Sequence, residues 1–337
     1  MSGRGGARIA ILGVGYAVPD AVRRNDDPVF DELLRDTPPG SELFGGYRER
    51  RVLSPGETVE DLLQTALERA LEDADLEASS VGMLLGYISV SDYRTPNGLS
   101  DAHRRLKLPQ AAPVLPINNE FNNFTTSLTI ARALMAAGGS GPALIACAGN
   151  WTQHVDYATP QSYSAADGAG CAVIGLTDEA SRFGIVDSET LVWADNFGAM
   201  YMAGDVVATV PDCGTHVRDC TYTTPYFHIP KAGMDEYRKF GIEAPPLAVN
   251  RLLERNRLKG PDIALITHQS SSVLLESWND AIRPCQFLDT LARFGNMTVA
   301  NLPVNLACGY GDIHTDHLVI CGIGVEGQVH AVLLSRE

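Results

Sequence analysis

Hydrophobic and polar positions divide the N-terminal half of the chain into alternating strands and helices. An apolar run at residues 8–15 predicts a buried strand, and residues 58–74 predict an amphipathic helix. The helix carries its apolar positions at helical spacing: Leu62, Leu63, Ala66, Leu67, Ala70 and Leu71. Further apolar runs predict strands at residues 81–90, 143–148 and 171–176. This alternation is typical of an α/β fold.

The pattern changes near residue 177 and then starts again. Residues 180–235 have no clean periodicity, which indicates short strands and a long loop. A second α/β block follows, with predicted helices at 246–258 and 273–282 and predicted strands at 263–267, 318–324 and 329–335. The two blocks echo each other without detectable residue identity. We therefore predict a structural duplication with halves 1–177 and 178–337.

Residues 114–139 combine a short apolar run, a polar turn and an apolar-periodic helix. The turn contains Asn118, Asn119, Asn122 and Asn123, and the helix begins near Phe124. Asparagine suits such turns because it tolerates left-handed backbone and caps helices. A helix start presents free N–H groups and a positive dipole end, so it can hold an anion or activate a nucleophile. An ordinary strand–loop–helix unit would show the same pattern.

Composition and charge restrict the classes of function. With 337 residues, 45% of them hydrophobic, the chain can bury a large core as one domain or two fused ones. It has no run of 18 apolar residues, and its N-terminal apolar run is too short for a signal peptide, so we expect a cytoplasmic protein without a membrane span. A net charge of −15 argues against general nucleic-acid binding. An acidic partner would need a local basic patch, such as Lys231, Arg238 and Lys239.

Motifs for metals, disulfides and dinucleotides are incomplete. The seven cysteines include no CxxC pair, so neither a zinc ribbon nor a disulfide framework is predicted. Residues 312–317 read DIHTDH, but two histidines three residues apart on a strand would face opposite sides, and we expect no metal. Gly13 and Gly15 resemble the start of a dinucleotide loop, but the third glycine is absent and Pro19 stands where the helix should begin.

Five short motifs follow one another over almost the whole chain. They are GYRERR at 46–51, ADGAG at 166–170, HQ at 268–269, GNMT at 295–298, and GD at 311–312 followed by VICGIG at 319–324. In this order they resemble the GIRERR, GDGAGA, HQAN, GNTS and GD…GxG motifs of the ketoacyl-ACP synthase III family, which belongs to the thiolase superfamily. Each motif is short, but the five in order support a resemblance that covers about residues 9–335.

The resemblance implies the thiolase fold, in which two βαβαβαββ-type halves stack in α-β-α-β-α layers. It also implies a homodimer and an acyl-thioester site between the halves. For this chain we expect the strands containing Ile117 and Ile266 to be central. The helices that begin near Phe121 and Ser270 should be buried between the layers.

The position of the family's nucleophile is occupied by a residue that cannot perform its chemistry. Aligning residues 124–128, FTTSL, on the family's CxGFxxxL motif places the catalytic cysteine at Phe121. A phenyl ring cannot carry an acyl group, so we expect the covalent mechanism to be lost. A slip of one residue would put Glu120 there, and its carboxylate could act as a general base. Cys308 is an alternative, as a displaced nucleophile.

The remaining family residues still predict an acyl-thioester site. The resemblance implies that His268 and Asn296 stabilise negative charge on a thioester oxygen. With Glu120 they are the predicted catalytic residues, and the predicted substrate-binding residues are Phe121, Asn122, Phe124 and Ser270. The basic cluster Lys231, Arg238 and Lys239 is the predicted carrier-binding patch. The tryptophan with which the family stacks the CoA adenine has no counterpart in residues 36–46, which favours a carrier-bound substrate over CoA.

Three hypotheses about function follow. The first is an acyltransferase of specialised polyketide-related or fatty-acid-related metabolism that acts on a carrier-bound or CoA-bound acyl thioester without an acyl-cysteine intermediate. The second is a decarboxylase or hydrolase of an acyl thioester that uses only the histidine and the asparagine. The third is a non-catalytic partner subunit of a paralogue that has the cysteine. The retained His268 and Asn296 favour the first hypothesis over the third. No cofactor other than the substrate's own thioester is expected.

Overall fold

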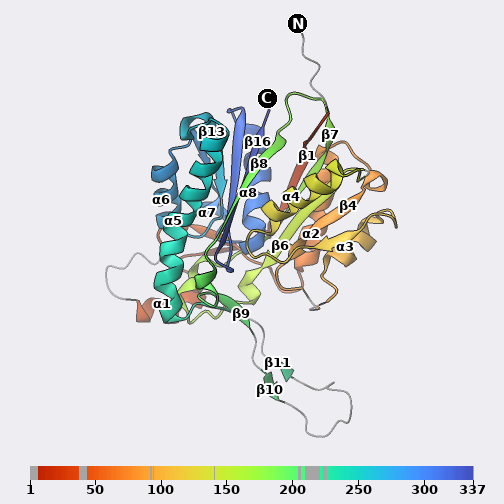
Figure 1. Cartoon of the computed structure of the whole chain (residues 1–337). Helices are drawn as coiled ribbons and strands as arrows, with labels where there is room; N and C mark the ends of the chain where they lie inside the picture. Colours follow the sequence, from red (N-terminus) through yellow and green to blue (C-terminus); the bar gives the residue numbers. More distant parts are fainter. Residues whose placement is uncertain are drawn as a thin grey trace.

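Ten strands form one mixed sheet made of two five-stranded parts with the same topology (Figure 1). The computed structural model describes residues 7–37, 44–91, 93, 95–139, 141–203, 206–208, 221–222 and 226–336. The first part has the order β5-β4-β6-β7-β1 and the second the order β14-β13-β15-β16-β8. In each part the first two pairings are parallel and the last two antiparallel. The repeated order is the topology expected of a duplicated fold.

The strands of the first part are β1 (Arg8–Ala17), β4 (Met83–Ile88), β5 (Val114–Pro116), β6 (Ala143–Asn150) and β7 (Asp167–Thr177). Those of the second part are β8 (Gly184–Val192), β13 (Ile263–Thr267), β14 (Gln286–Leu288), β15 (His317–Ile323) and β16 (Gln328–Ser335). The two parts meet where Ala10 of β1 pairs with Gly184 of β8. The connection between β7 and β8 contains the predicted division at 177/178, and the extent of the two halves stays a prediction.

Two helices lie between the two parts of the sheet. α4 (Asn123–Ala136) contacts β4 and β6 of the first part and β8, β15 and β16 of the second. α8 (Asn301–Gly309) contacts β1 and β7 of the first part and β13 and β15 of the second. In its own part each helix follows the edge strand and precedes the next strand of the sheet, α4 between β5 and β6 and α8 between β14 and β15, so the two helices occupy equivalent places in the repeat. They form the central layer of the predicted α-β-α-β-α arrangement.

The outer layers consist of two helix pairs on opposite sides of the molecule (Figure 1). α2 (Val59–Asp73) and α3 (Leu99–Leu106) cover the first part, while α5 (Lys231–Arg255) and α6 (Ser272–Ile282) cover the second. The shorter elements are α1 (Asp31–Asp36), α7 (Leu291–Phe294), β2 (Val22–Arg24), β3 (Glu49–Arg51), β9 (Tyr201–Ala203), β10 (Val206–Ala208), β11 (Thr221–Tyr222) and β12 (Tyr226–His228). No helix in the described part of the chain is long and apolar enough to cross a membrane.

Two expectations about central elements are wrong. β5 ends at Pro116, immediately before Ile117, and is the edge strand of the sheet rather than a central one. The helix near Ser270 is α6, which packs on α5 in the outer layer because its buried residues Leu275 and Trp278 lie on one face only. At its start Val273 is 64% exposed. The counterpart of α4 is therefore α8, which follows Asn296.

α5 begins fifteen residues before the predicted start at Pro246 and contains both Pro245 and Pro246. A proline inside a helix removes the N–H that would bond the carbonyl four residues earlier. For Pro245 that carbonyl is Gly241 O, and the indole Nε1 of Trp278 in α6 donates to it at 2.7 Å. A neighbouring helix thus supplies the donor that Pro245 lacks, and α5 continues through both prolines.

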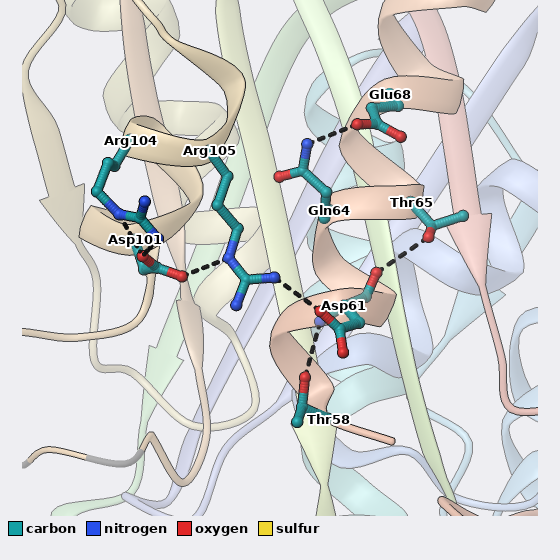
Figure 2. A network of polar contacts seen from close by, with 8 residues as sticks. All are labelled: Thr58, Asp61, Gln64, Thr65, Glu68, Asp101, Arg104 and Arg105. Carbon is teal, nitrogen blue, oxygen red and sulfur yellow. Dashed lines mark hydrogen bonds and ion pairs between the residues drawn. The ribbon is translucent and has the colours of Figure 1, made fainter. Parts of the chain in front are cut away.

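A polar network on the outer surface joins α2 to α3 (Figure 2). Arg105 of α3 donates to Asp61 at 2.7 Å and to Asp101 at 2.5 Å. Asp61 lies in the first turn of α2, where Thr58 caps the helix by accepting a hydrogen bond from the Asp61 N–H at 3.2 Å. These charges are at the surface, so the network orients the two helices and stabilises them only modestly.

Gly13 and Gly15 permit α2 to pack directly on β1. A Cβ at Gly13 would lie 2.5 Å from Ala74 N, and a Cβ at Gly15 would lie 2.4 Å from Ala66 O. Because both opposing atoms belong to the backbone, a side chain would force the helix away from the strand. The glycine pair is therefore a packing contact inside a strand.

We expect Gly15→Ala to lower the free energy of unfolding by about 1–3 kcal/mol or more, because the added methyl overpacks a rigid contact. Gly311→Ala is the matched control, since a Cβ at Gly311 meets nothing within 4 Å. It should change stability by less than about 0.5 kcal/mol. Urea unfolding followed by circular dichroism measures both, and equal effects of the two variants would contradict the close contact between β1 and α2.

Candidate functional site

His268 stands at the end of β13 and is almost completely buried. Its side chain is 2% exposed, and its backbone N–H donates to Cys321 O at 3.1 Å. Gln269 fixes the turn that follows, because its Nε2 donates to Thr267 O at 2.8 Å and its Oε1 accepts from Thr290 N at 3.0 Å. The two residues of the HQ motif thus have separate tasks: the glutamine holds the backbone and the histidine is presented to the interior.

Asn296 precedes α8 and is attached to the first half of the chain. Its N–H donates to Ser164 O at 2.8 Å, and its carbonyl accepts from Ala166 N at 3.0 Å. Gly295 has a φ of +80°, and a Cβ there would lie 2.9 Å from the Ala166 side chain. The GNMT motif of the second half is therefore seated against the ADGAG motif of the first half. The site lies at the junction of the halves.

Arg50 of the GYRERR motif supports the same segment. Its side chain is fully buried, and its Nε donates to Tyr163 O, immediately before Ser164, at 2.5 Å. The guanidinium lies over the rings of Phe30, Phe44 and Tyr47, at 5.1–5.4 Å from the ring centroids. Cation–π contacts and carbonyl groups here replace a carboxylate partner. Burial lowers the pKa of Arg50 to about 10, so the guanidinium stays charged near neutral pH.

Three buried side chains form a continuous polar network at the site. Asn301, the first residue of α8, donates from Nδ2 to Asn296 Oδ1 at 2.7 Å. The same Nδ2 lies 3.4 Å from His268 Nδ1. Backbone N–H groups complete the arrangement, since Met297 N donates to Asn301 Oδ1 at 2.8 Å and Thr298 N donates to Asn296 Oδ1 at 3.0 Å. His268 and Asn296 are thus joined through one intervening amide.

Burial makes His268 a neutral side chain. Transfer of the imidazole out of water lowers its pKa to about 3, because desolvation penalises the charged form. At neutral pH the ring therefore has one N–H donor and one acceptor nitrogen. Asn296 Oδ1 already accepts two hydrogen bonds, which leaves the Asn296 Nδ2 as its donor group. A neutral imidazole and an amide side by side can stabilise an oxyanion.

Phe121 lies directly against His268. The two rings are stacked with centroids 4.9 Å apart and an interplanar angle of 9°. Phe121 also packs against Phe227 of β12 at 5.4 Å, and Phe227 packs against Trp151 at 6.1 Å. Phe121, which aligns with the family's cysteine, therefore contacts His268 through an apolar ring.

The end of β15 holds the turn before α4 in place. A Cβ at Gly322 would lie 2.4 Å from Asn122 Oδ1, and a Cβ at Gly324 would lie 2.7 Å from Glu120 O. The Nδ2 of Asn122 donates across to Gln328 O at 2.9 Å. The GxG motif thus lets the turn approach the strand closely, which fixes Phe121 relative to His268.

The side chain of Glu120 has a different partner from that of Phe121. Its Oε1 accepts a hydrogen bond from Ser89 Oγ at 2.7 Å, at the end of β4. Its backbone N–H donates to Glu326 Oε1 at 3.1 Å. Glu120 and Phe121 therefore diverge: the carboxylate faces Ser89, while the phenyl ring faces His268. A catalytic role of Glu120 stays a prediction.

The other predicted residues are less clearly part of the site. Asn122 and Phe124 are fully buried and support the start of α4, and Ser270 accepts a hydrogen bond on its carbonyl from Tyr47 OH at 2.5 Å. Their role in substrate binding stays a prediction. In the predicted carrier patch, Arg238 and Lys239 are exposed on α5, whereas the side chain of Lys231 lies outside the described residues. Carrier binding likewise stays a prediction.

No hydrogen bond joins the side chain of a described cysteine to the His268–Asn301–Asn296 network, and a nucleophilic role of Cys308 stays a prediction. Burial raises the pKa of Cys147 and Cys321 to about 12 and raises that of Cys171 as well. Cys308 is partly buried, and its recorded partners are Arg293, at 3.5 Å, and Tyr16. Neither partner belongs to the His268 network. Among the described residues, no group of three His, Cys, Asp or Glu side chains is arranged to hold a metal ion.

Sequence reasoning missed Asn301 and Ser89. Asn301 could have been noticed as the single amide in an otherwise apolar segment, VANLPV, five residues after Asn296. At that spacing the side chain lies about one and a half helical turns further on, still close to the turn that presents Asn296. Ser89 has no such signal, because it follows β4 as an ordinary polar residue at a strand end.

Comparisons with known proteins show which proteins the chain is similar to. The profile of the family described as 3-oxoacyl-[acyl-carrier-protein (ACP)] synthase III matches residues 115–191. β-Ketoacyl-[acyl-carrier-protein] synthase III of Nitratidesulfovibrio vulgaris is 26% identical over 88% of each chain. The 2-heptyl-4(1H)-quinolone synthase subunit PqsC of Pseudomonas aeruginosa is 26% identical over 94% of each chain.

The fold has close counterparts among solved structures. The priming β-ketosynthase of a polyketide biosynthetic pathway superimposes with a TM-score of 0.81 at 20% identity, over 99% of this chain and 98% of that one. At this level of identity the superposition establishes the fold. The family profile covers residues 115–191, and the relatives of similar length are 26% identical. The chain therefore has the thiolase fold and is similar over most of its length to ketoacyl-ACP synthases III.

Proposed function

We propose that this protein is an acyltransferase that moves an acyl group from a carrier-bound or CoA-bound thioester directly to an acceptor, without an acyl-cysteine intermediate. One observation carries the proposal. His268 and Asn296 are joined in a complete hydrogen-bond network, while the residue beside them is Phe121, stacked on the imidazole at 4.9 Å. The groups that stabilise an oxyanion are in place, and the group that would form a covalent intermediate is replaced.

The chemistry assigned to the pair is electrostatic. As the acceptor's oxygen or nitrogen attacks the thioester carbon, negative charge develops on the thioester oxygen, and His268 and Asn296 donate hydrogen bonds to it. The new C–O or C–N bond forms, the C–S bond breaks, and the thiol leaves with a proton. Phe121 supplies an apolar wall that keeps water from the neutral imidazole.

Glu120 is the candidate for the proton transfer. Burial raises its pKa to about 7, with the Ser89 hydrogen bond opposing the rise and the nearby Glu326 charge adding to it. A carboxyl group with such a pKa exchanges protons readily near neutral pH. The Glu120 carboxylate can accept the proton of the attacking acceptor and return that proton to the leaving thiolate. The Ser89 hydroxyl is its hydrogen-bond partner.

The partners and the metabolic setting belong to the proposal as well. Relatives named for ketoacyl-ACP synthase III support an acyl carrier protein or acyl-CoA as donor, and the polyketide priming enzyme supports specialised metabolism as a setting. Arg238 and Lys239 lie exposed on a chain with a net charge of −15, and they could receive an acidic carrier. Homodimer formation is proposed from the family resemblance.

A partner subunit without catalysis is the second candidate, and the Phe121 stack favours it. A ring lying flat on His268 restricts access to the imidazole, and one relative, PqsC, is named as a subunit of a synthase. A decarboxylase or hydrolase would also need only the His268–Asn296 pair. Product analysis with the protein alone, and with a paralogue that has the cysteine, separates these candidates from the acyltransferase.

We expect the stability difference between Glu120→Gln and the wild-type protein to increase with pH. Folding raises the pKa of Glu120 from 4.5 to about 7, so its contribution to stability is full below about pH 4.5 and is lost as the pH rises through 7. Glutamine imitates the protonated form at every pH. Between about pH 5 and about pH 8, the free energy of unfolding of the variant should therefore rise by about 1–3 kcal/mol relative to that of the wild type. Urea unfolding across this range measures the gain.

The matched control is Glu236→Gln, at an exposed position of α5. Its stability difference from the wild type should stay level over the same pH range. A level difference for Glu120→Gln would mean that the carboxyl group is solvated in the folded protein, and it would remove Glu120 as the proposed base.

Incubation with panels of acyl-CoA and acyl-carrier thioesters should leave the intact mass of the protein unchanged while product forms. His268→Ala should lower turnover by about 10²–10³, as expected for the loss of one oxyanion donor. Cys308→Ala should have little effect, because Cys308 has no partner recorded in the His268 network. Intact-protein mass spectrometry together with chromatography of the products tests all three. An acyl adduct on a native cysteine would overturn direct transfer.

Phe121→Cys should restore covalent loading with an acyl group. The turn before α4 is still in place, and free N–H groups at a helix start lower the pKa of a nearby thiol. Phe121→Ala removes the same ring without adding a thiol, and each variant should lose about 3–5 kcal/mol of stability. The adduct is expected on Phe121→Cys alone. A folded Phe121→Cys protein that is never acylated would show that residue 121 does not stand at the nucleophile position.

A further inference from the structure

The side-chain amide of Asn301 occupies the position between the two proposed oxyanion donors. It is fully buried at the first residue of α8, and its Nδ2 lies 2.7 Å from Asn296 Oδ1 and 3.4 Å from His268 Nδ1. An amide nitrogen has two hydrogens and no acceptor. One hydrogen can therefore go to each neighbour, and both neighbours must then present an acceptor atom to it.

The orientation of the two amides is set by the backbone. Met297 N donates to Asn301 Oδ1 at 2.8 Å, so the oxygen of this amide must face Met297 and its nitrogen must face the site. Thr298 N donates to Asn296 Oδ1 at 3.0 Å, which in turn directs the Asn296 oxygen inward. A flipped amide at either position would bring two donors together at these distances.

These orientations determine where the proton of the neutral imidazole lies. Because Asn301 presents N–H to His268 Nδ1, that nitrogen must be the acceptor, and the single ring proton must be on Nε2. Likewise, since Asn296 Oδ1 is saturated by Asn301 and Thr298, its Nδ2 points away from α8. Both remaining donors, Nε2–H of the histidine and Nδ2–H of the asparagine, can then face one oxygen.

We propose that Asn301 is a positioning residue, which fixes the Nε2–H tautomer of His268 and the donor orientation of Asn296 through its single Nδ2 group. The consequence for acyl transfer rests on the proposed function of the His268–Asn296 pair. The tautomer itself does not, because it follows from the hydrogen-bond network alone. Asn301 would not touch the substrate, and its effect would be transmitted by the two side chains that do.

Asn301→Asp tests the proposal with almost no change of shape. The carboxylate keeps an oxygen for Met297 N, but it places a second acceptor where the amide nitrogen was. His268 Nδ1 must then carry a proton, and the negative charge within about 4 Å should raise the pKa of the imidazole by about 1–3 units from its lowered value of about 3.

Imidazole ¹⁵N spectra of the uniformly labelled full-length protein provide the readout, recorded from about pH 8 down to about pH 5. The chain has eight histidines, and the signals of His268 are those missing from the spectrum of His268→Gln. In the wild-type protein they should show a protonated Nε2 and an unprotonated Nδ1 throughout. In Asn301→Asp they should show a protonated Nδ1. A wild-type Nδ1–H tautomer, or signals averaged between tautomers, would overturn the proposal.

Asn305→Asp is the matched control, one helical turn further along α8. Asn305 is equally buried, and its Nδ2 donates to Leu288 O at 2.8 Å instead of contacting the site. This variant introduces the same charge into the same helix and should leave the His268 signals unchanged. Identical spectra for the two aspartate variants would reduce Asn301 to a packing residue. If Asn301→Asp does not fold, the wild-type tautomer still decides the outcome.

The two proposals fail separately. A protein that forms no product from any acyl thioester, but shows the Nε2–H tautomer and its reversal in Asn301→Asp, would contradict the acyltransferase and retain the role of Asn301. A protein that transfers acyl groups while His268 has a proton on Nδ1 would retain the acyltransferase and contradict the role of Asn301.

Discussion

The pair of backbone hydrogen bonds between Asn296 and residues 164–166 is the contact on which the site depends. It fastens a loop of the second half to the segment just before β7 of the first half, at 2.8 and 3.0 Å. Arg50 holds the same segment from the other side through Tyr163 O. Because α8 begins five residues after Asn296, this attachment also sets the position of the central helix. The three motifs GYRERR, ADGAG and GNMT therefore form one assembly.

Motif order allowed the fold and the principal residues of the site to be predicted from the sequence. His268 and Asn296 could be assigned to one site because each stands in a short motif that resembles one of the family's, HQ in one case and GNMT in the other. Hydrophobic periodicity also located most strands. It failed for α5, because the predicted start at Pro246 lies inside the helix. The donor that makes a helix possible there comes from Trp278, which is 33 residues away in the sequence.

Which helix of the second half corresponds to α4 could not be predicted from the sequence. Both the turn at Ser270 and the turn at Asn296 are polar and are followed by helices, so the sequence does not distinguish an outer helix from a central one. Burial distinguishes them. α8 is buried around most of its circumference, whereas α6 has one buried face and an exposed Val273. The role of Asn301 could not be derived from the sequence because it depends on which atoms of three separate residues meet.

The indole–carbonyl contact between α6 and α5 has a mechanical consequence. A hydrogen bond at the proline pair is a fixed point along a helix of 25 residues, since it prevents α5 from turning or sliding on α6 at Gly241. The half of α5 beyond this point packs on β8 and β16. The half before it follows β12, whose Phe227 touches the ring that covers His268. Gly241 therefore separates the part of α5 that follows this aromatic contact from the part that ends at Arg255, whose guanidinium is paired with Asp187 and Glu189 of β8.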